Sequence, residues 1–337
     1  MREINPEVLI VAEVGSVHDG SFGNAKKIIE VAAACGVDAV KFQTHIPEAE
    51  TLLDAPMPPY FKGEPRFKYF KRTGFSLEQW CEIKQHRDEN SVVFLSSPFS
   101  EEAVDLLEKV GMSQYKIPSG EVTNTPMLEK IAKLGKPVIL SSGMSSWDEL
   151  DHAVATIHNH NKRLTVLQCT SEYPCSYEQV GLNVMLEMSA RYDVPVGYSD
   201  HTLTNYAVYA AVTLGASIVE KHFTFSRKMY GSDAQHSLEP DGMTDLVQGV
   251  RAIETMLTSP VNKEDITAYA EMKRIFEKSL VTAVDIAAGT RLTRSMVAIK
   301  KPGTGISAAR LEEFLGREIR RSIFAGEVLL ESDFILI

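Results

Sequence analysis

Short apolar runs rich in β-forming residues recur eight times in this sequence, and stretches with helical periodicity separate them. The runs begin at Val8, Ala39, Val92, Tyr115, Pro137, Thr165, Val194 and Ser217. Intervening segments such as 101–111 and 125–135 end in glycine, as helices commonly do. Eight strand–helix units in alternation predict a (β/α)8 TIM barrel. The alternative is a doubly wound open sheet, but no Gly-x-Gly-x-x-Gly motif follows the first run, which counts against a dinucleotide-binding fold.

The pattern changes from Ser279 onward, where short strands and turns replace the alternation. A weak internal repeat relates residues 288–292 to residues 325–329. We therefore expect two domains, a barrel over 1–275 and a small, mostly-β domain over 276–337. A chain of fewer than about 70 residues forms only a marginal core, so the small domain is expected to pack against another surface.

The composition argues against two classes of partner. A formal net charge of -10 gives neither nucleic acid nor an anionic membrane an electrostatic reason to approach. No stretch reaches the roughly 18 apolar residues of a membrane span, and the N-terminal apolar run lacks the cleavage site of a signal peptide. We expect a cytoplasmic protein, in which the four cysteines are reduced thiols.

Polar side chains gather at the ends of the predicted strands, which is the face where TIM barrels carry their active sites. They are Glu13, Lys41, Gln43, Ser97, Lys116, Ser119, Glu121, Ser141, Ser171, Tyr173, Ser199, His201 and His222. Two lysines and several hydroxyls on one rim suit a phosphate and a carboxylate, because charged donors neutralise the anions and neutral donors fill the remaining lone pairs. Phosphoenolpyruvate carries both groups. The alternative for Lys41 and Lys116 is a structural ion pair with Glu13 or Glu121.

Two histidines end neighbouring strands of the predicted barrel, His201 after the seventh run and His222 in the eighth. Adjacent strands lie about 4.8 Å apart, so the two imidazoles can converge on one ion. Two protein nitrogens leave positions open for substrate oxygens and water, as a catalytic metal site requires. The alternative is a pair of satisfied core histidines.

Ordered motifs along the chain resemble the sialic acid synthase family, which includes N-acetylneuraminate, legionaminate and pseudaminate synthases. They are AEVGSVHDG, KFQTH, SSPF, YKIPSGEVTN, ILSSGM, QCTSEYP, GYSDHT and EKHFT. The tail KKPGTGISAARLEEFLG resembles the family's C-terminal antifreeze-like (SAF) domain. The resemblance implies a metal-dependent condensation of phosphoenolpyruvate with an amino-sugar aldose. It also implies a domain-swapped homodimer in which the antifreeze-like domain covers the partner's active site.

The resemblance assigns roles residue by residue. His201 and His222 match the ligands of Mn2+, with Mg2+ or Co2+ as other candidate ions. The positions that match phosphoenolpyruvate contacts are Ser97, Lys116, Ser119, Ser141, Ser171 and Ser199. The positions on the sugar side are Gln43, Tyr173, Asp233 and Lys301. Glu13, Lys41 and Glu121 are the catalytic candidates, and Glu13 is assigned to proton transfer at the sugar hydroxyl or the aldehyde oxygen.

Three departures from the family pattern concern the acceptor sugar. Lys301 replaces an arginine that reaches toward the sugar's N-acyl group, and lysine lacks the planar two-pronged geometry of arginine. Ser171 stands where some relatives have asparagine. The long connection 47–75, which is expected to be a binding loop or lid, matches no relative.

The default acceptor is N-acetylmannosamine, and 2,4-diacetamido-6-deoxymannose, which gives legionaminate, is an alternative. Pseudaminate synthesis is disfavoured by the sequences at 119–121 and 238–240. A 6-phosphate acceptor is a further alternative, because the long connection carries Lys62, Arg66, Lys68, Lys71 and Arg72. A non-catalytic binding barrel is disfavoured because the polar set is intact. A different phosphoenolpyruvate-condensing barrel is disfavoured because it would lack the antifreeze-like domain.

Overall fold

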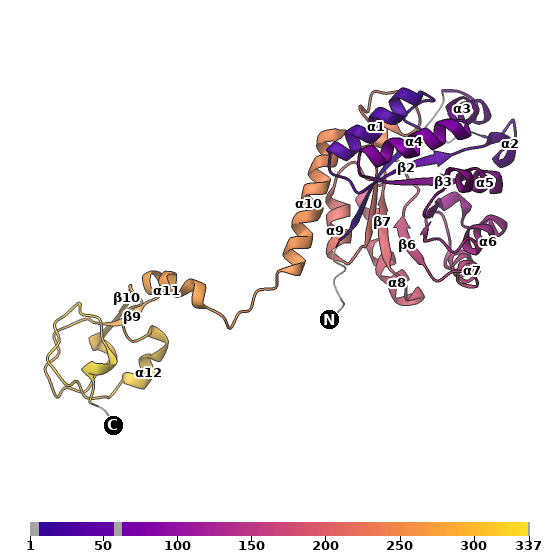
Figure 1. Ribbon diagram of the computed structural model, residues 1–337. Coiled ribbons are helices and arrows are strands. Elements are labelled where there is room, and N and C mark those ends of the chain that lie inside the picture. Colours follow the sequence, from indigo (N-terminus) through magenta and orange to yellow (C-terminus); the bar gives the residue numbers. More distant parts are fainter. Residues whose placement is uncertain (1–6, 57–62, 336–337) are drawn as a thin grey trace. The chain divides into compact units, whose positions relative to one another are not determined.

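Eight parallel strands form the centre of the first of two compact units. The structure is a computed structural model that describes residues 7–56 and 63–335, and its contacts divide the chain between Pro260 and Val261. The strands are β1 Leu9–Gly15, β2 Ala39–Thr44, β3 Val93–Pro98, β4 Tyr115–Ile117, β5 Val138–Ser141, β6 Leu164–Cys169, β7 Val196–Asp200 and β8 Ile218–His222. Their order is β3-β2-β1-β8-β7-β6-β5-β4, and β3 also contacts β4, so the sheet closes into a barrel (Figure 1). The predicted TIM barrel is confirmed.

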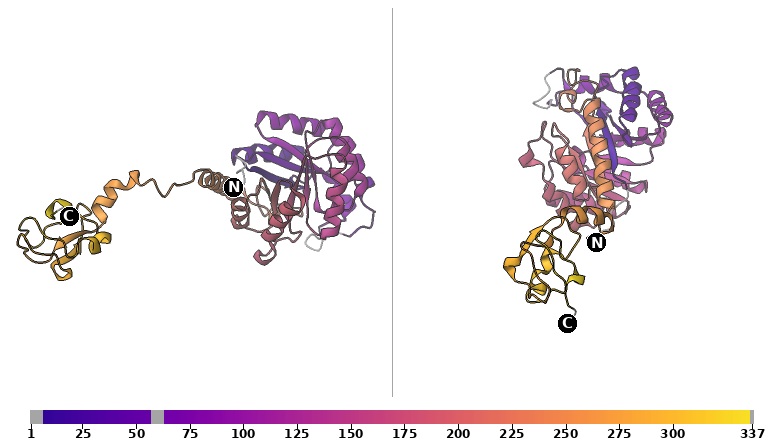
Figure 2. Two further views of the ribbon diagram at one scale, coloured as in Figure 1. Left: turned by 90° about the horizontal axis from the view of Figure 1, so that it is seen from below. Right: turned by 90° about the vertical axis from the view of Figure 1, so that its left-hand side faces the viewer.

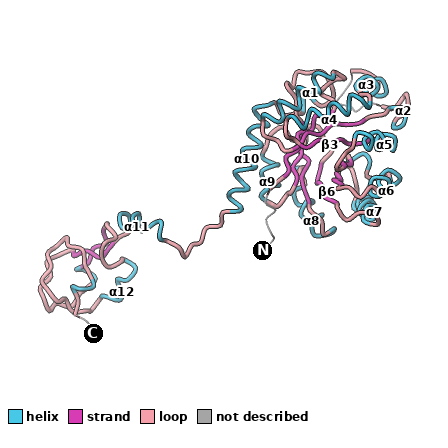
Figure 3. The backbone as a smooth tube through the Cα atoms, viewed as in Figure 1, coloured by secondary structure: helices cyan, strands magenta, loops and turns pink. Residues whose placement is uncertain are grey.

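Helices surround the strands, as the view from below in Figure 2 and the colouring in Figure 3 show. They are α1 Phe22–Ala34, α2 Pro47–Glu50, α3 Arg66–Thr73, α4 Leu77–Glu89, α5 Glu101–Val110, α6 Thr125–Lys133, α7 Trp147–His158, α8 Leu182–Tyr192, α9 Tyr206–Thr213 and α10 Pro240–Thr258. Two of them begin with complete capping boxes, formed by Ser76 with Gln79 and by Ser146 with Glu149. None of the helices in the described part of the chain is long and apolar enough to cross a membrane.

The barrel interior has an apolar layer. It consists of Val11, Ala39, Leu95, Ile139, Leu167 and Ile218. Side chains alternate between the two faces of a strand, so the residue two positions farther along also points inward. Those residues are Glu13, Lys41, Ser97, Ser141, Cys169 and Glu220. A polar layer therefore lies directly above the apolar one, toward the carboxyl ends of the strands.

The connection after β2, predicted as a long loop, contains the two short helices α2 and α3. Tyr69 of α3 is buried, and Phe70 stacks on His45 at 3.7 Å between ring centroids. The connection is therefore partly folded and contacts the end of β2.

The second unit contains α11 Ala270–Phe276, β9 Ser279–Thr282, β10 Val297–Lys300 and α12 Leu311–Phe314. The strands β9 and β10 pair antiparallel. Its own apolar core consists of Leu280, Ile286, Leu292, Val297, Ile306, Phe314, Ile319, Ile323, Leu329 and Phe334. A backbone bridge between Ile286 and Ile323 joins the two halves of the sequence repeat. By contacts, residues 261–275 group with this unit.

Candidate active site

A cavity of about 420 Å³ opens at the carboxyl ends of the barrel strands. It is lined by all of the predicted site residues except two, namely by Glu13, Lys41, Gln43, Ser97, Lys116, Ser119, Ser141, Ser171, Tyr173, Ser199, His201, His222 and Asp233. The two exceptions are Glu121 and Lys301. The side chain of Glu121 accepts a hydrogen bond from Asn124 Nδ2 at 2.8 Å and lines a neighbouring cleft. Lys301 belongs to the second unit, where its Nζ lies 4.8 Å above the Phe276 ring.

Four charged side chains form a chain of ion pairs at the base of the cavity. Lys41 Nζ is 2.9 Å from Glu13 Oε2 and 3.4 Å from Glu220 Oε1. Lys116 Nζ is 3.0 Å from the same Glu220 oxygen, which also accepts a hydrogen bond from Ser199 Oγ at 3.0 Å. The predicted pairing of Lys41 with Glu13 is present, but Lys116 pairs with Glu220. With both carboxylates ionised, the four charges cancel within the protein.

Burial sets the protonation behaviour of these groups. It pushes the pKa of Glu220 upward, but Lys116 and Lys41 outweigh it and hold that pKa at about 2. Burial raises the pKa of Glu13 despite the nearby Lys41, and Glu220 adds to the rise. Burial lowers the pKa of Lys116 against the opposing pull of Glu220. Glu220 is therefore the fixed negative charge of the group, whereas Glu13 is poised to exchange a proton.

Hydroxyl groups line the part of the cavity next to Lys116. Ser141 Oγ is buried and has no hydrogen-bond partner among the described residues. The backbone N–H of Gly143 donates to Ser119 Oγ at 3.1 Å. A side chain at Gly143 would collide with the hydroxyls of Ser119 and Ser171, which would have to move. An unpaired buried hydroxyl beside a buried lysine is suited to an oxyanion of a ligand.

The two predicted metal-binding histidines lie side by side, with ring centroids 5.5 Å apart. His201 Nδ1 donates to the carbonyl oxygen of Thr170 at 2.7 Å, which leaves its Nε2 as the acceptor nitrogen. His222 Nδ1 is buried and has no hydrogen-bond partner among the described residues. Burial lowers the pKa of His222 to about 3 despite Asp233, so its imidazole is neutral.

These features fit a divalent metal ion, because imidazole nitrogens with free lone pairs are the donors it needs. Burial opposes protonation of His201, but Cys169 and the Thr170 carbonyl outweigh it and raise the pKa of His201, so a cation bound there would displace a proton. No third histidine, cysteine or carboxylate joins them in a ligand cluster within residues 7–56 and 63–335. The remaining coordination positions would therefore be left to substrate and water.

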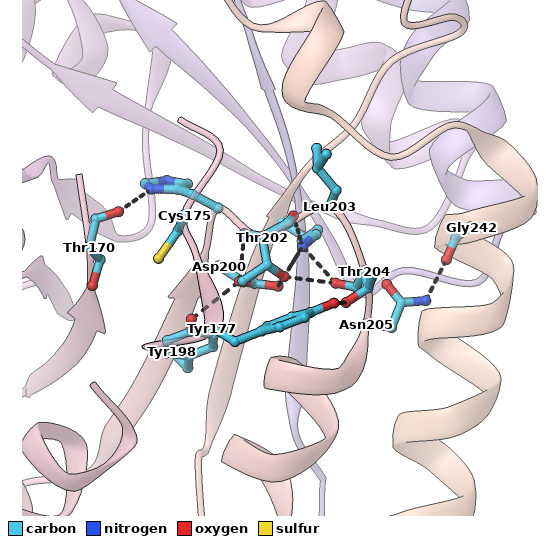
Figure 4. Close-up of polar contacts among 12 residues, drawn as sticks. Thr170, Cys175, Tyr177, Tyr198, Asp200, Thr202, Leu203, Thr204, Asn205 and Gly242 are labelled. Carbon is cyan, nitrogen blue, oxygen red and sulfur yellow. Dashed lines mark hydrogen bonds and ion pairs between the residues drawn. The ribbon is translucent and has the colours of Figure 1, made fainter. Parts of the chain in front are cut away.

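A buried ion pair on the outside of the barrel supports the loop that carries His201 (Figure 4). Lys221 Nζ donates to the carboxylate of Asp200, to the carbonyl oxygen of Thr202 and, at 2.9 Å, to that of Thr204. The carbonyl oxygen of His201 accepts from the Cys175 N–H at 2.9 Å. The loops after β6 and β7 are thus held together beneath the two histidines.

Asp233 lines the cavity next to the end of β1. Its Oδ2 accepts the Ser16 N–H at 3.1 Å, and its Oδ1 accepts from Ser232 Oγ at 2.8 Å. Gly15 adopts a positive φ of 54°, and a Cβ there would collide with the Asp233 carboxylate. The glycine at the end of β1 therefore leaves space for the Asp233 carboxylate.

Several residues that line the cavity were absent from the predicted set. The main ones are Glu220, His45 and Phe70, and Arg66 was predicted only as one of five basic residues for a 6-phosphate acceptor. Glu220 precedes His222 by two positions on the same strand, so the inward period of two could have identified it. His45 follows Gln43 by the same interval. Arg66 and Phe70 lie on α3, and no periodic signal in the sequence places that helix over the cavity.

Comparison with known proteins agrees with this geometry. Residues 28–262 match the NeuB family, and residues 277–335 match the SAF domain. The chain is 38% identical over 335 residues to the N,N'-diacetyllegionaminic acid synthase of Campylobacter jejuni, and the match covers 96% of this chain and 99% of that protein. It is 36% identical over 296 residues to the N-acetylneuraminate-9-phosphate synthase of Homo sapiens, covering 86% of this chain and 82% of that protein.

A solved structure gives the same result. The N-acetylneuraminic acid synthetase of Leptospira borgpetersenii superimposes with a TM-score of 0.69 at 28% identity, covering 79% of this chain and 90% of that chain. Relatives named for different products match along most of the chain, so the similarity identifies the family and leaves the acceptor open. The predicted resemblance is confirmed, and the chain belongs to the NeuB family, whose relatives are sialic acid synthase-type enzymes, with a SAF domain after the barrel.

Proposed function

We propose that this protein condenses phosphoenolpyruvate with an amino-sugar aldose, forms a nonulosonate and releases phosphate. The observation that carries the proposal is the composition of one cavity. It holds two buried lysines, the hydroxyl of Ser141, which has no partner among the described residues, and two histidine rings whose centroids lie 5.5 Å apart. The lysines and the hydroxyl can bind the phosphate and carboxylate of phosphoenolpyruvate, and a metal ion held by the histidines could polarise an aldehyde.

The charge balance of the cavity supports a divalent cation, with Mn2+ as the first candidate. Glu220 compensates one of the two buried lysines, and Glu13 compensates the other when it is ionised. The phosphate and carboxylate of phosphoenolpyruvate together carry more negative charge than these lysines leave unmatched. A divalent cation held by His201 and His222 would add positive charge and polarise the aldehyde oxygen of the sugar.

The residues of the chain supply the remaining steps. Lys116 and the hydroxyls of Ser119 and Ser141 bind the phosphate and orient phosphoenolpyruvate, so that its C3 attacks the aldehyde carbon. Glu13 delivers a proton to the oxygen of the former aldehyde, because its raised pKa favours the acid form. Water adds at C2 and gives one proton to the Glu13 carboxylate. The C2–O bond to phosphate then breaks, C2 becomes a ketone, and the phosphate leaves with the remaining proton of the added water.

The acceptor is proposed to be N-acetylmannosamine or a related acetamido sugar, including 2,4-diacetamido-6-deoxymannose. The similarity to a protein named as an N,N'-diacetyllegionaminic acid synthase supports the second of these. In both cases Gln43, Tyr173 and Asp233 would contact the sugar, since they line the same cavity as the lysines and Tyr173 lies beside His201 and His222.

One observation favours a 6-phosphate acceptor as a second candidate. Among the basic residues of the long connection, Lys71 pairs with Glu48 and Arg72 with Glu64 and Asp19 near the surface. Lys62 lies outside the described residues. Arg66 lines the cavity, stacks over Phe70 at 5.1 Å and forms no ion pair with the described part of the chain. Its guanidinium is available to a phosphate on the acceptor.

A domain-swapped homodimer is part of the proposal. The second unit exposes several large apolar side chains, namely Tyr269, Met272, Phe276 and Phe324. Such side chains on a small domain favour burial against another surface, here the cavity side of a second copy. Light scattering should give twice the monomer mass, and a monomer that is fully active would contradict the swap.

The test of the proposed function is phosphate release by metal-stripped protein. The protein receives phosphoenolpyruvate with N-acetylmannosamine, its 6-phosphate or 2,4-diacetamido-6-deoxymannose, each with and without Mn2+. Release that requires both one sugar and the metal is the expected result. Arg66→Gln should reduce release only with the 6-phosphate, by about tenfold or more. Absence of release with all three sugars would contradict the proposed acceptors.

A further inference from the structure

A line of polar contacts runs from α2 into the cavity. Glu50 Oε1 is 2.7 Å from His45 Nδ1, and His45 Nε2 is 3.1 Å from Gln43 Oε1. Gln43 Nε2 then donates to Glu13 Oε1 at 2.8 Å. The line connects a carboxylate outside the barrel to the proposed proton-transfer residue.

The imidazole in the middle of this line is fixed in place. Phe70 stacks on His45 with ring centroids 3.7 Å apart, and Phe99 stacks on it at 4.1 Å. The side chains of His45 and Glu50 are each 4% exposed. The ring therefore keeps one nitrogen on Glu50 and the other on Gln43, and only its protons can change.

Counting donors shows that two arrangements are compatible with these positions. With the Gln43 oxygen on His45 and its NH2 on Glu13, both ring nitrogens face acceptors, so both must carry hydrogen. A neutral His45 has only one N–H group, on Nδ1, and it donates to the Glu50 carboxylate. The Nε2 atom then has no hydrogen and must accept a hydrogen bond. The Gln43 amide can donate this bond only after it rotates by half a turn, so that its NH2 group faces His45. The turned amide presents its oxygen to Glu13.

We propose that His45 is a positioning residue that controls, by gaining or losing a proton, which end of the Gln43 amide faces Glu13. The inference rests on the proposed function, in which Glu13 transfers a proton. An N–H directed at Glu13 stabilises its carboxylate, and a carbonyl oxygen destabilises it. The geometry thereby links a histidine outside the reacting atoms to the acid–base behaviour of the cavity.

The charged groups around His45 come from several elements. They are Glu50 on α2, Arg66 on α3, Glu13 and His18 at and after β1, and Asp233 after β8. Burial lowers the pKa of His45, and Arg66 acts in the same direction, while Glu50 and Asp233 oppose them. Glu50 is the one that hydrogen-bonds to the ring, so it is the group whose removal should change the titration most.

The first test compares two glutamates of α2. Glu50→Gln removes the carboxylate from His45, whereas Glu48→Gln removes an exposed carboxylate that pairs with Lys71. The titration midpoint of His45 is followed by NMR of ring-15N-labelled histidine, with His45→Asn used to assign the signal. We expect Glu50→Gln to lower the midpoint by about one pH unit and Glu48→Gln to leave it unchanged. Equal midpoints in all three proteins would overturn the inference.

The second test asks whether the amide carries the effect. The midpoint of the kcat–pH profile should fall by about one pH unit on Glu50→Gln in the otherwise unchanged protein. In a Gln43→Met background the same substitution should leave the midpoint in place. An equal shift in both backgrounds, or none in the first, would overturn the role of Gln43. The NMR titration needs no turnover, so failure of the proposed function would remain distinguishable from failure of this inference.

Discussion

Two buried lysine networks lie on opposite faces of β8. On the outer face, Lys221 donates to the Asp200 carboxylate and to the carbonyl oxygens of Thr202 and Thr204. Those three acceptors match the three N–H groups of an ammonium. On the inner face, Lys116 pairs with Glu220 beside a cavity, and the neighbouring Ser141 hydroxyl has no partner within the described residues.

The comparison shows that burial of a charged side chain does not by itself distinguish a structural ion pair from a ligand-binding one. The lysines of both networks are almost fully buried, at 2% for Lys221 and 4% for Lys116. In the outer network the Lys221 ammonium is saturated by acceptors of the protein. The inner one leaves donors unused beside open volume. Unused hydrogen-bonding capacity therefore marks the functional network.

Breaking the outer network should have the largest effect on stability. Lys221→Met leaves Asp200 buried without its counter-charge, and we expect the free energy of unfolding to fall by about 3–5 kcal/mol. Urea denaturation measures it. The control is Lys26→Met, which removes a surface pair with Glu82 at 3.2 Å and should cost at most about 1 kcal/mol. Equal losses in the two variants would contradict the comparison.

Breaking the inner network should affect activity more than stability. Lys116→Met removes a donor for the proposed phosphate, and we expect phosphate release to fall about 100- to 1,000-fold. Its effect on unfolding should be smaller than that of Lys221→Met, because Glu220 keeps Lys41 at 3.4 Å. The surface variant Lys130→Met, which loses a pair with Asp105, serves as the control and should retain activity. A larger loss of stability than in Lys221→Met would reverse the assignment of the two networks.

Two buried histidines differ in the same way, one with its ring nitrogen hydrogen-bonded and one without a partner. Burial of the first predicts that the free energy of unfolding depends on pH. His18 Nδ1 accepts the Gly20 N–H at 3.2 Å, whereas His222 Nδ1 has no partner in the described chain. Burial lowers the pKa of His18 to about 4, against a raising effect of Asp233. Because the folded-state pKa lies below the unfolded value, the neutral ring stabilises the fold above about pH 6.5, and this stabilisation is lost as the pH falls toward 4.

The loss should amount to at most about 3 kcal/mol between pH 6.5 and pH 4. His18→Asn should flatten the dependence of unfolding free energy on pH in this window. The exposed His152 provides the control, since His152→Asn should preserve the slope. Urea denaturation at a series of pH values distinguishes the variants, and identical slopes in all of them would exclude His18 as the source.

The smallest effect on activity is expected from a substitution of Gly143, whose backbone lies beside the hydroxyls of the cavity. Gly143→Ala would press a methyl group on the hydroxyls of Ser119 and Ser171. We expect the KM for phosphoenolpyruvate to rise about tenfold, equivalent to about 1.4 kcal/mol. Gly23→Ala, which meets no atom within 4 Å, is the matched control. An unchanged KM in Gly143→Ala would show that Ser119 and Ser171 do not bind the phosphate.

The barrel and most of its polar rim could be predicted because both follow from local periodicity. Strand alternation and the position of each strand end place Glu13, Lys41 and Ser141 on one inward face. The partner of Lys116 could not be predicted in the same way. Its contact with Glu220 depends on closure of the barrel, which brings β4 across from β8.

The acceptor side was less predictable. Arg66 enters the cavity from α3, within a connection that was expected to be a loop, and its position depends on packing of Phe70 against His45. Glu121 was predicted by resemblance to act in catalysis, yet it faces the cleft next to the cavity. Lys301 lies in the separate second unit, so the sequence of one chain gives no geometry for its contact with a sugar.

The apolar layer beneath the polar one has a consequence for how this protein can change over generations. Val11 and Glu13 occupy successive inward positions of one strand, so deleting Ala12, the residue between them, would turn Glu13 away from the cavity and toward the helices. A change of length within a strand therefore disrupts both the core and the cavity. An insertion in the connection 47–75 leaves the inward and outward alternation of the strands unchanged. Diversity of substrates can therefore accumulate there while the reaction itself is inherited intact.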